Sequence, residues 1–169
     1  ISSEDVECLL ATTVDAALSS NWVVASGSLP PGTSLSIYRD LATRLEGTGA
    51  RLAVDTSGDA LEATVGSPVA LLKPNRKELA ELVGAPIETL GDVVDAATAL
   101  QLRAAEVVIV SLGSDGAVLA DKDGVRFGST AVEAVGNTVG SGDAMLAGFI
   151  AGESLDEDPF VCSLAWAGA

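Results

Sequence analysis

Short apolar segments alternate with longer segments of helical periodicity along this chain, and this alternation limits the folds that it can adopt. Residues 22–26, 51–55, 69–73 and 107–110 are mostly apolar, and the segments between them place apolar residues three or four positions apart. Strands that are apolar almost throughout are typical of parallel sheets covered by helices on both faces. We therefore predict a three-layer α/β/α architecture with a mainly parallel central sheet.

Local signals give the expected boundaries of several elements. Residues 117–120 and 125–127 flank the turn Asp121–Gly124 and predict an antiparallel hairpin. Asn75 and Thr89 are expected to open helices. A further helix with an apolar face from Leu35 to Leu45 is expected to be capped by Thr33 or Ser34. Two closing helices are expected, one after Asp143 and one from Pro159 to Ala169.

The length of the chain and its composition favour one folded unit. The chain has 169 residues, of which 48% are hydrophobic and 20% charged, so we predict a single α/β core domain over 1–169. No apolar run reaches the roughly 18 residues of a membrane span, and no signal peptide is recognisable, so we expect a cytoplasmic protein without a membrane partner. The chain starts at Ile1 without Met and stops inside a helical pattern, so we expect it to be part of a longer protein.

Charge and residue types exclude several classes of function. The formal net charge is 9 − 24 = −15, which disfavours nucleic acid and anionic membranes as partners. The chain contains no histidine, and its two cysteines, Cys8 and Cys162, lie far apart in the sequence. A zinc cluster or a Ser-His-Asp triad therefore cannot be built from these residues.

Polar or glycine-rich clusters follow the predicted strands. They comprise residues 26–32, 55–58, 73–78 and 111–116. Ligands of open α/β sheets bind beyond the carboxyl ends of the strands, so we expect these clusters to line one rim of the sheet.

The segment Asn137–Asp143 carries the main chemical signal. Its glycines and serine, Gly140, Ser141 and Gly142, form a tight turn before a predicted helix. Such a turn directs backbone N–H groups and the positive end of the helix dipole at one point, which suits a phosphate or a phosphoryl group in transfer. Asp143 at this point could accept the proton of an attacking hydroxyl. The alternative is a plain loop in which Asp143 is a helix N-cap.

Three other groups on the rim each have a functional and a structural interpretation. Asn75 and Glu78 could hold hydrated Mg²⁺, or they could form a capping box. Lys73 could meet a phosphate, or it could be a solvated lysine at a strand end. The remaining group could approach a nucleotide phosphate or form a hairpin turn, and it comprises Ser111, Leu112, Gly113, Ser114, Asp115 and Gly116.

Taken in order, these motifs closely resemble those of the PfkB/ribokinase family of carbohydrate kinases, and within it most of all the 1-phosphofructokinase and tagatose-6-phosphate kinase branch. The resemblance covers essentially all 169 residues. The motifs that carry it are residues 26–32, 55–58, 73–79, 111–113 with Gly116, and 138–143.

The resemblance implies a ribokinase-like fold and ATP-dependent phosphorylation of a sugar-phosphate hydroxyl, with fructose 1-phosphate converted to fructose 1,6-bisphosphate. Asp143 would be the catalytic base, and the backbone of Gly140, Ser141 and Gly142 the anion hole. Residues 111–116 and Lys73 would bind ATP, and Asn75 and Glu78 would belong to the network of Mg²⁺ and phosphate.

Departures from the family pattern set limits on this expectation. Asn137 stands where the family usually has Asp or Ser, and Ser141 stands where it usually has Ala. Chains of the family are nearly twice as long, and their N-terminal part supplies the lid sheet, most of the sugar site and often a dimer contact. We therefore expect little turnover from these residues alone. The full-length protein is expected to be a kinase and is a candidate homodimer. Tagatose-6-phosphate kinase or another sugar kinase, a non-catalytic sugar-phosphate or nucleotide sensor, and an inactive fragment are the alternatives.

Overall fold

The computed structural model describes residues 2–130 and 140–168, and these residues form one mixed sheet. The strands lie side by side in chain order; the first four are parallel, and the last two add an antiparallel hairpin. This confirms the predicted mainly parallel sheet and the hairpin. The strands are β1 (Trp22–Ser26), β2 (Arg51–Asp55), β3 (Val69–Leu72), β4 (Ala105–Ser111), β5 (Ala117–Asp121) and β6 (Gly124–Gly128).

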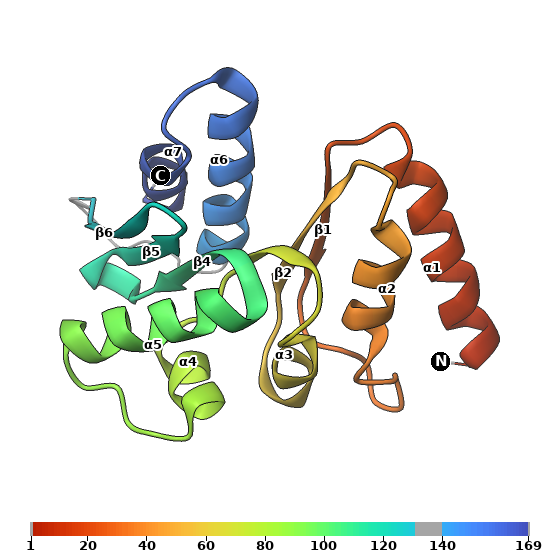
Figure 1. The fold of residues 1–169 in the computed structure, drawn as a ribbon, viewed down its shortest axis with the longest axis horizontal. Coiled ribbons are helices and arrows are strands. Elements are labelled where there is room, and N and C mark those ends of the chain that lie inside the picture. Colours follow the sequence, from red (N-terminus) through yellow and green to blue (C-terminus); the bar gives the residue numbers. More distant parts are fainter. Residues whose placement is uncertain (1, 131–139, 169) are drawn as a thin grey trace.

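Helices follow most of the strands, as the alternation predicts (Figure 1). They are α1 (Ser3–Ala17), α2 (Ile37–Leu45), α3 (Gly58–Thr64), α4 (Arg76–Val83), α5 (Leu90–Ala104), α6 (Ser141–Leu155) and α7 (Pro159–Ala167), with a 3₁₀ turn at Gly113–Asp115. None of the helices in the described ranges has both the length and the apolar content needed to span a bilayer.

Two apolar cores lie on opposite faces of the sheet. Alternate strand residues point to opposite faces. Val54, Leu72 and Val108 pack in the core that contains α1 to α5. Their neighbours Ala53, Leu71 and Ile109 pack against α6 and α7. Figure 1 shows α6 and α7 above the β4–β6 part of the sheet and α4 and α5 below it. The three-layer arrangement is therefore confirmed.

Caps define most helix starts as the sequence predicts. Asn75 accepts a hydrogen bond from the backbone of Glu78 and caps α4, which ends at Gly84 with φ 67°. Thr89 caps α5 through a box with Asp92. Side chains of this type satisfy N–H groups that a helix start leaves without partners.

The start of α2 differs from the prediction. Neither Thr33 nor Ser34 is the cap; Ser36 occupies that position without a side-chain cap bond. Leu35 lies before the helix and is 46% exposed, so it is not part of the apolar face. The physical reason is local: the Ser34 hydroxyl accepts from the backbone N–H of Ser36, which closes a short turn before the helix begins.

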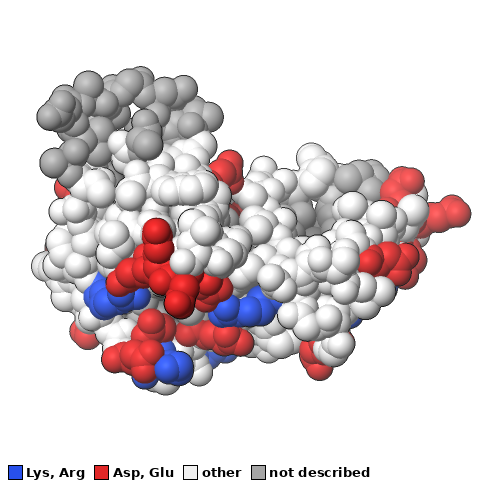
Figure 2. Space-filling view, turned by 90° about the horizontal axis from the view of Figure 1, so that it is seen from above, with Lys and Arg blue, Asp and Glu red and all other residues white. Residues whose placement is uncertain are grey.

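The surface carries an excess of acidic side chains. Figure 2 shows red acidic groups on the face seen from above, both at the right end and in a cluster where blue basic groups adjoin them. This agrees with the net charge of −15.

Candidate active site

The start of α6 presents an anion-binding arrangement. Gly140 is its N-cap residue and has φ 86°, a left-handed conformation that favours glycine. Within the described part of the chain no side chain caps this helix end. The Ala144 N–H donates to the Gly140 carbonyl at 2.8 Å, so the helical turn is closed. The first-turn N–H groups and the positive end of the dipole therefore face the rim of the sheet.

Asp143 lies in the first turn of α6 and is exposed. The alternative that makes Asp143 the N-cap is wrong, because Gly140 occupies that position. The side-chain hydroxyl of Ser26, at the end of β1, donates to Asp143 Oδ1 over 2.6 Å. An ionised carboxylate accepts such a bond well. This contact fixes the carboxylate of the candidate base over the carboxyl end of the sheet.

A buried ion pair lies beside the same helix start. Lys73 Nζ is 2.9 Å from Asp55 Oδ2, and the Lys73 side chain is only 5% exposed. A Cβ added to Gly142 would be 2.9 Å from Lys73 Nζ and 3.3 Å from Asp55 Oδ2. The structural interpretation of Lys73 as a solvated strand-end lysine is therefore wrong. Its ammonium reaches the backbone that is proposed to form the anion hole.

Strand register explains why these groups meet. Ser26 is paired with Asp55 across β1 and β2, and Ala53 is paired with Leu71 across β2 and β3. Because residues two apart in a strand share a face, Ser26, Asp55 and Lys73 lie on the face that α6 covers. Three strand ends thus supply one polar row under one helix start.

The segment from Ser111 to Gly116 forms a compact turn next to this row. Gly113 and Gly116 have φ 64° and 105°, and the Leu112 N–H donates to the Gly116 carbonyl at 2.9 Å. A bridge between Asn75 and Ser111 joins the segment to the start of α4. Asp115, exposed beside Ser114, lies 3.6 Å from Arg76. The turn geometry is confirmed, and its contact with a nucleotide stays a prediction.

Asn75 and Glu78 form the capping box that was the structural alternative. Asn75 Oδ1 accepts from the Glu78 N–H at 2.9 Å, and Glu78 Oε2 accepts from the Asn75 N–H at 2.8 Å. No group of three or more acidic or sulfur ligands suited to a metal occurs in the described ranges. Since the cap engages one oxygen of Glu78, the carboxylate retains acceptor capacity for a Mg²⁺ ion that keeps most of its water and phosphate ligands. The residues fit such an ion, and the role stays a prediction.

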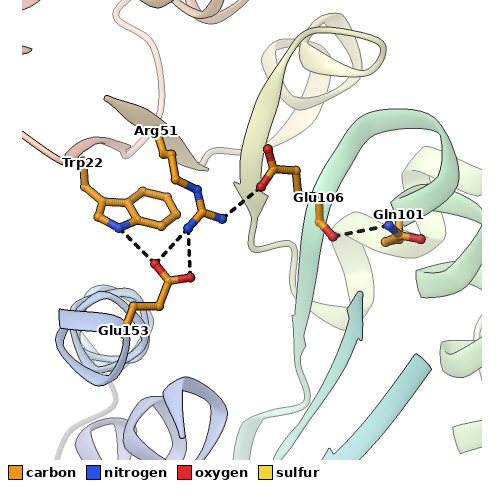
Figure 3. Close-up of polar contacts among 5 residues, drawn as sticks. All are labelled: Trp22, Arg51, Gln101, Glu106 and Glu153. Carbon is orange, nitrogen blue, oxygen red and sulfur yellow. Dashed lines mark hydrogen bonds and ion pairs between the residues drawn. The ribbon is translucent and has the colours of Figure 1, made fainter. Parts of the chain in front are cut away.

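The C-terminal part of α6 contacts the amino ends of β1 and β2 (Figure 3). Glu153 accepts hydrogen bonds from Trp22 Nε1 at 3.1 Å and from Arg51 Nη1 at 2.9 Å. Arg51 also pairs with Glu106 at 3.0 Å and stacks over the Trp22 ring at 4.3 Å. Both ends of α6 therefore contact the strands directly, and this sets where Asp143 lies.

The structure brings together most of the predicted site and adds two residues to it. Lys73 lies against Gly142, the chain neighbour of Asp143, and Asn75 and Ser111 adjoin each other on the same rim. Residues 137–139 of the main motif lie outside the described residues. Sequence reasoning gave no role to Ser26 and Asp55. The available signal was their position as last residues of adjacent predicted strands.

Comparisons with known proteins agree with this fold. A model of the pfkB family carbohydrate kinases matches residues 2–159. The chain belongs to this family of sugar kinases.

Several phosphofructokinases are similar to this chain in sequence or in structure. The chain is 42% identical over 129 residues to the 1-phosphofructokinase of Haloferax volcanii, and 45% identical over 141 residues to the ATP-dependent 6-phosphofructokinase isozyme 2 of Mycobacterium tuberculosis. These matches cover 76% and 82% of this chain and 41% of each relative. A crystal structure of phosphofructokinase-2 from Escherichia coli in complex with potassium superposes with a TM-score of 0.90 at 29% identity, over 100% of this chain and 56% of that one. The chain thus spans about half the length of its relatives.

Proposed function

We propose that a full-length protein containing this chain transfers a phosphoryl group from ATP to a hydroxyl of a sugar phosphate, in the cytoplasm. One observation carries the proposal: Asp143 lies in the first turn of α6, held by Ser26 at 2.6 Å, beside a helix start that Lys73 adjoins. A carboxylate next to an anion-binding helix end is what a hydroxyl acceptor and a transferring phosphoryl group together require. Membership of the family supports the same chemistry.

In this mechanism Asp143 accepts the proton of the attacking hydroxyl. The Ser26 hydroxyl orients the Asp143 carboxylate. The backbone N–H groups at Gly140, Ser141 and Gly142 stabilise the negative charge of the transferring phosphoryl group. Catalysis of phosphoryl transfer is mainly positioning and electrostatic stabilisation, and these groups supply part of both. Mg²⁺, when bound through the Asn75 and Glu78 network, supplies charge neutralisation on the phosphates.

We propose fructose 1-phosphate as the acceptor, converted to fructose 1,6-bisphosphate. Several relatives named 1-phosphofructokinase support this choice. The 45% identity to a 6-phosphofructokinase favours fructose 6-phosphate as a second candidate. Tagatose 6-phosphate is a third. The matched relatives extend well beyond this chain, so the sugar site and any homodimer contact belong to the full-length protein.

The substrate proposal is tested by coupled ADP release with MgATP against fructose 1-phosphate, tagatose 6-phosphate and fructose 6-phosphate. We expect the full-length protein to turn over fructose 1-phosphate, and these 169 residues alone to show little or no rate. Turnover of fructose 6-phosphate alone would select the second candidate. A clear rate with fructose 1-phosphate from the chain alone would contradict the expected need for the remaining part.

Substitution of the base separates a kinase from a sugar-phosphate or nucleotide sensor. In the full-length protein, Asp143→Asn should lower kcat by about 100-fold or more, as expected for loss of a general base, with affinity for ATP largely kept. Asp15→Asn, at an exposed position on α1, is the matched control and should leave kcat unchanged. An Asp143→Asn protein with unchanged kcat would remove the proposed base from the mechanism.

A further inference from the structure

Asp55 and Lys73 form the most enclosed of the ion pairs that the described residues show. Their side chains are 20% and 5% exposed, whereas Arg44–Glu7 and Lys122–Asp123 leave 38% to 84% of each side chain exposed. Lysine and aspartate are rarely buried unless they are paired. The pair is therefore not a surface contact, and its place in the fold calls for a physical reason.

The Asp55–Lys73 pair lies under the first turn of α6. Asp55 ends β2, and Lys73 follows the last residue of β3. The paired neighbours Ala53 and Leu71, two residues earlier in each strand, lie in the core under α6 and α7. The ammonium of Lys73 therefore approaches α6 from the sheet side, opposite Gly142.

A lysine ammonium needs a partner to hold one position. The side chain is a flexible four-carbon stem with a point charge, so its direction is set by the acceptor that it meets. The acceptor that the Lys73 ammonium meets is Asp55 Oδ2, at 2.9 Å. With this contact the ammonium lies at the helix end that already carries the positive part of the dipole.

We propose that Asp55 is a positioning residue of the phosphoryl-transfer site, which acts through Lys73. It holds the lysine against Gly142, so that a fixed positive charge stands behind the anion hole when negative charge builds up on the transferring group. This inference rests on the proposed function and assigns to it a residue that makes no contact with substrate in the mechanism above.

Removal of the Asp55 charge has two opposing consequences. It takes a negative charge away from an anion site, which would strengthen anion binding. It also replaces the ionised acceptor of Lys73 with the neutral oxygen of an amide, which binds the ammonium more weakly, so the lysine is held less firmly against Gly142. We expect the second effect to prevail, because phosphoryl transfer depends on charges held in place. The direction in which kcat changes in Asp55→Asn shows which of the two consequences prevails.

The test is a double-substitution cycle in the full-length protein. Asp55→Asn and Lys73→Met should each lower kcat about 10-fold or more, since one preorganised donor of this kind contributes 10²–10³ in kcat elsewhere. The double variant should lose no more than Lys73→Met alone, because Asp55 acts only through the lysine. The KM for the sugar phosphate should change less than kcat. Glu7→Gln, which breaks the exposed pair with Arg44, is the control and should leave both unchanged.

Two results would overturn the proposal. One is a double variant whose loss is the product of the two single losses, which would mean that Asp55 acts independently of Lys73. The other is an Asp55→Asn protein with kcat equal to or above that of the unaltered protein. If Asp55→Asn does not fold, the comparison of Lys73→Met with the double variant, in which no buried charge is left unpaired, decides the question alone.

The proposed function and this inference can fail separately. If the unaltered protein turns over none of the three sugar phosphates, the proposed function fails. The inference is then judged by calorimetric binding of inorganic pyrophosphate. Asp55→Asn should weaken that binding about five-fold, and should have no further effect in the Lys73→Met background. Unchanged or tighter binding in Asp55→Asn would overturn the inference.

Discussion

Two glycines at the start of α6 are required for different physical reasons. Gly140 has φ 86°, and a Cβ there would meet nothing within 4 Å, so backbone conformation alone favours glycine. Gly142 is the second residue of the helix, and a Cβ there would press on Lys73 Nζ at 2.9 Å. At position 142 the requirement is space for an ammonium group.

Gly142→Ala should therefore impair activity without unfolding the protein. The added methyl group would displace Lys73, and we expect kcat to fall about 10-fold or more, in line with loss of one preorganised charge. Stability should change little, since alanine favours the helix by about 1 kcal/mol over glycine. The measurement is kcat of the full-length protein together with its thermal midpoint.

Gly91→Ala is the matched control, because Gly91 is the second residue of α5. A Cβ at Gly91 would meet only Thr89 Oγ1, at an ordinary 3.5 Å. This variant should keep kcat and gain stability. Equal kcat in Gly142→Ala and Gly91→Ala would show that the Lys73 contact has no role in turnover.

At the residue scale, part of the candidate site could be predicted from the sequence. Asp143 and Gly140 could be predicted because their chemistry is local: a glycine turn and the helix that follows it are adjacent in the chain. Ser26 and Asp55 could not be assigned roles, because Ser26 meets Asp143 across 117 positions. Such a meeting depends on register and on which face α6 covers, and neither is contained in a short motif.

At the scale of elements, α6 is held closely against its neighbours. A Cβ at Gly148 would lie 2.5 Å from the backbone oxygen of Cys162, in α7. Glu153 anchors the helix to Trp22 and Arg51. Glycine in a helix interior is intrinsically unfavourable, so its presence here reflects close approach of two helix backbones.

Gly148→Ala should separate α6 from α7. Because the colliding atoms are backbone atoms that cannot turn aside, we expect a loss of about 1–3 kcal/mol in the free energy of unfolding, as for overpacked cores. Urea denaturation measures it. Ala147→Ser, at an exposed position one residue earlier, should stay within about 0.5 kcal/mol. A Gly148→Ala protein as stable as that control would contradict the packing argument.

The capping box of α5 makes stability depend on pH. The pKa of Asp92 is lowered, chiefly because the backbone N–H of Thr89 donates to its carboxylate, with further bonds from the Thr89 side chain and the Glu88 N–H. The folded state thus binds this proton more weakly than the unfolded state does. Its stabilisation is complete above the ordinary aspartate pKa of about 4 and is lost as the pH falls through the lower folded value.

Asp92→Asn should therefore be less stable than the unaltered protein at neutral pH, with a difference that shrinks as the pH falls below about 4. Urea unfolding at a series of pH values measures this difference. Asp95→Asn, exposed on the same helix and outside the capping box, should show no such trend. A constant gap between Asp92→Asn and the unaltered protein down to low pH would contradict the assignment.

At the scale of the whole molecule, the sheet and its three-layer arrangement could be predicted from the sequence, but the face that each helix covers could not. Strands β3 and β4 are apolar over most of their length, so their burial on both faces was predictable. Which helices cover which face was not, because strands apolar on both sides do not distinguish the two faces. The capping residues Thr33 and Ser34 were assigned wrongly because several hydroxyl side chains near α2 compete for the same role.

The overall charge makes the local design of the site necessary. A net charge of −15 opposes the approach of anions, among them the ATP and sugar phosphate that are proposed as substrates. The proposed binding of these anions would therefore depend on short-range contacts, such as those of Lys73 and the start of α6. Screening by salt within about 8–10 Å leaves such close contacts in force.

The chain order of the strands has a consequence for assembly. Each strand pairs with its neighbour in sequence, so every step of the sheet closes a modest loop. The contact of Ser26 with Asp143 instead closes a loop of 117 residues. The entropic cost of closing a loop grows only slowly with loop length. The contacts between α6 and the first strand must nevertheless offset the whole of this cost. The sheet can therefore form by local additions, whereas the candidate site forms only when α6 packs back onto the end of β1.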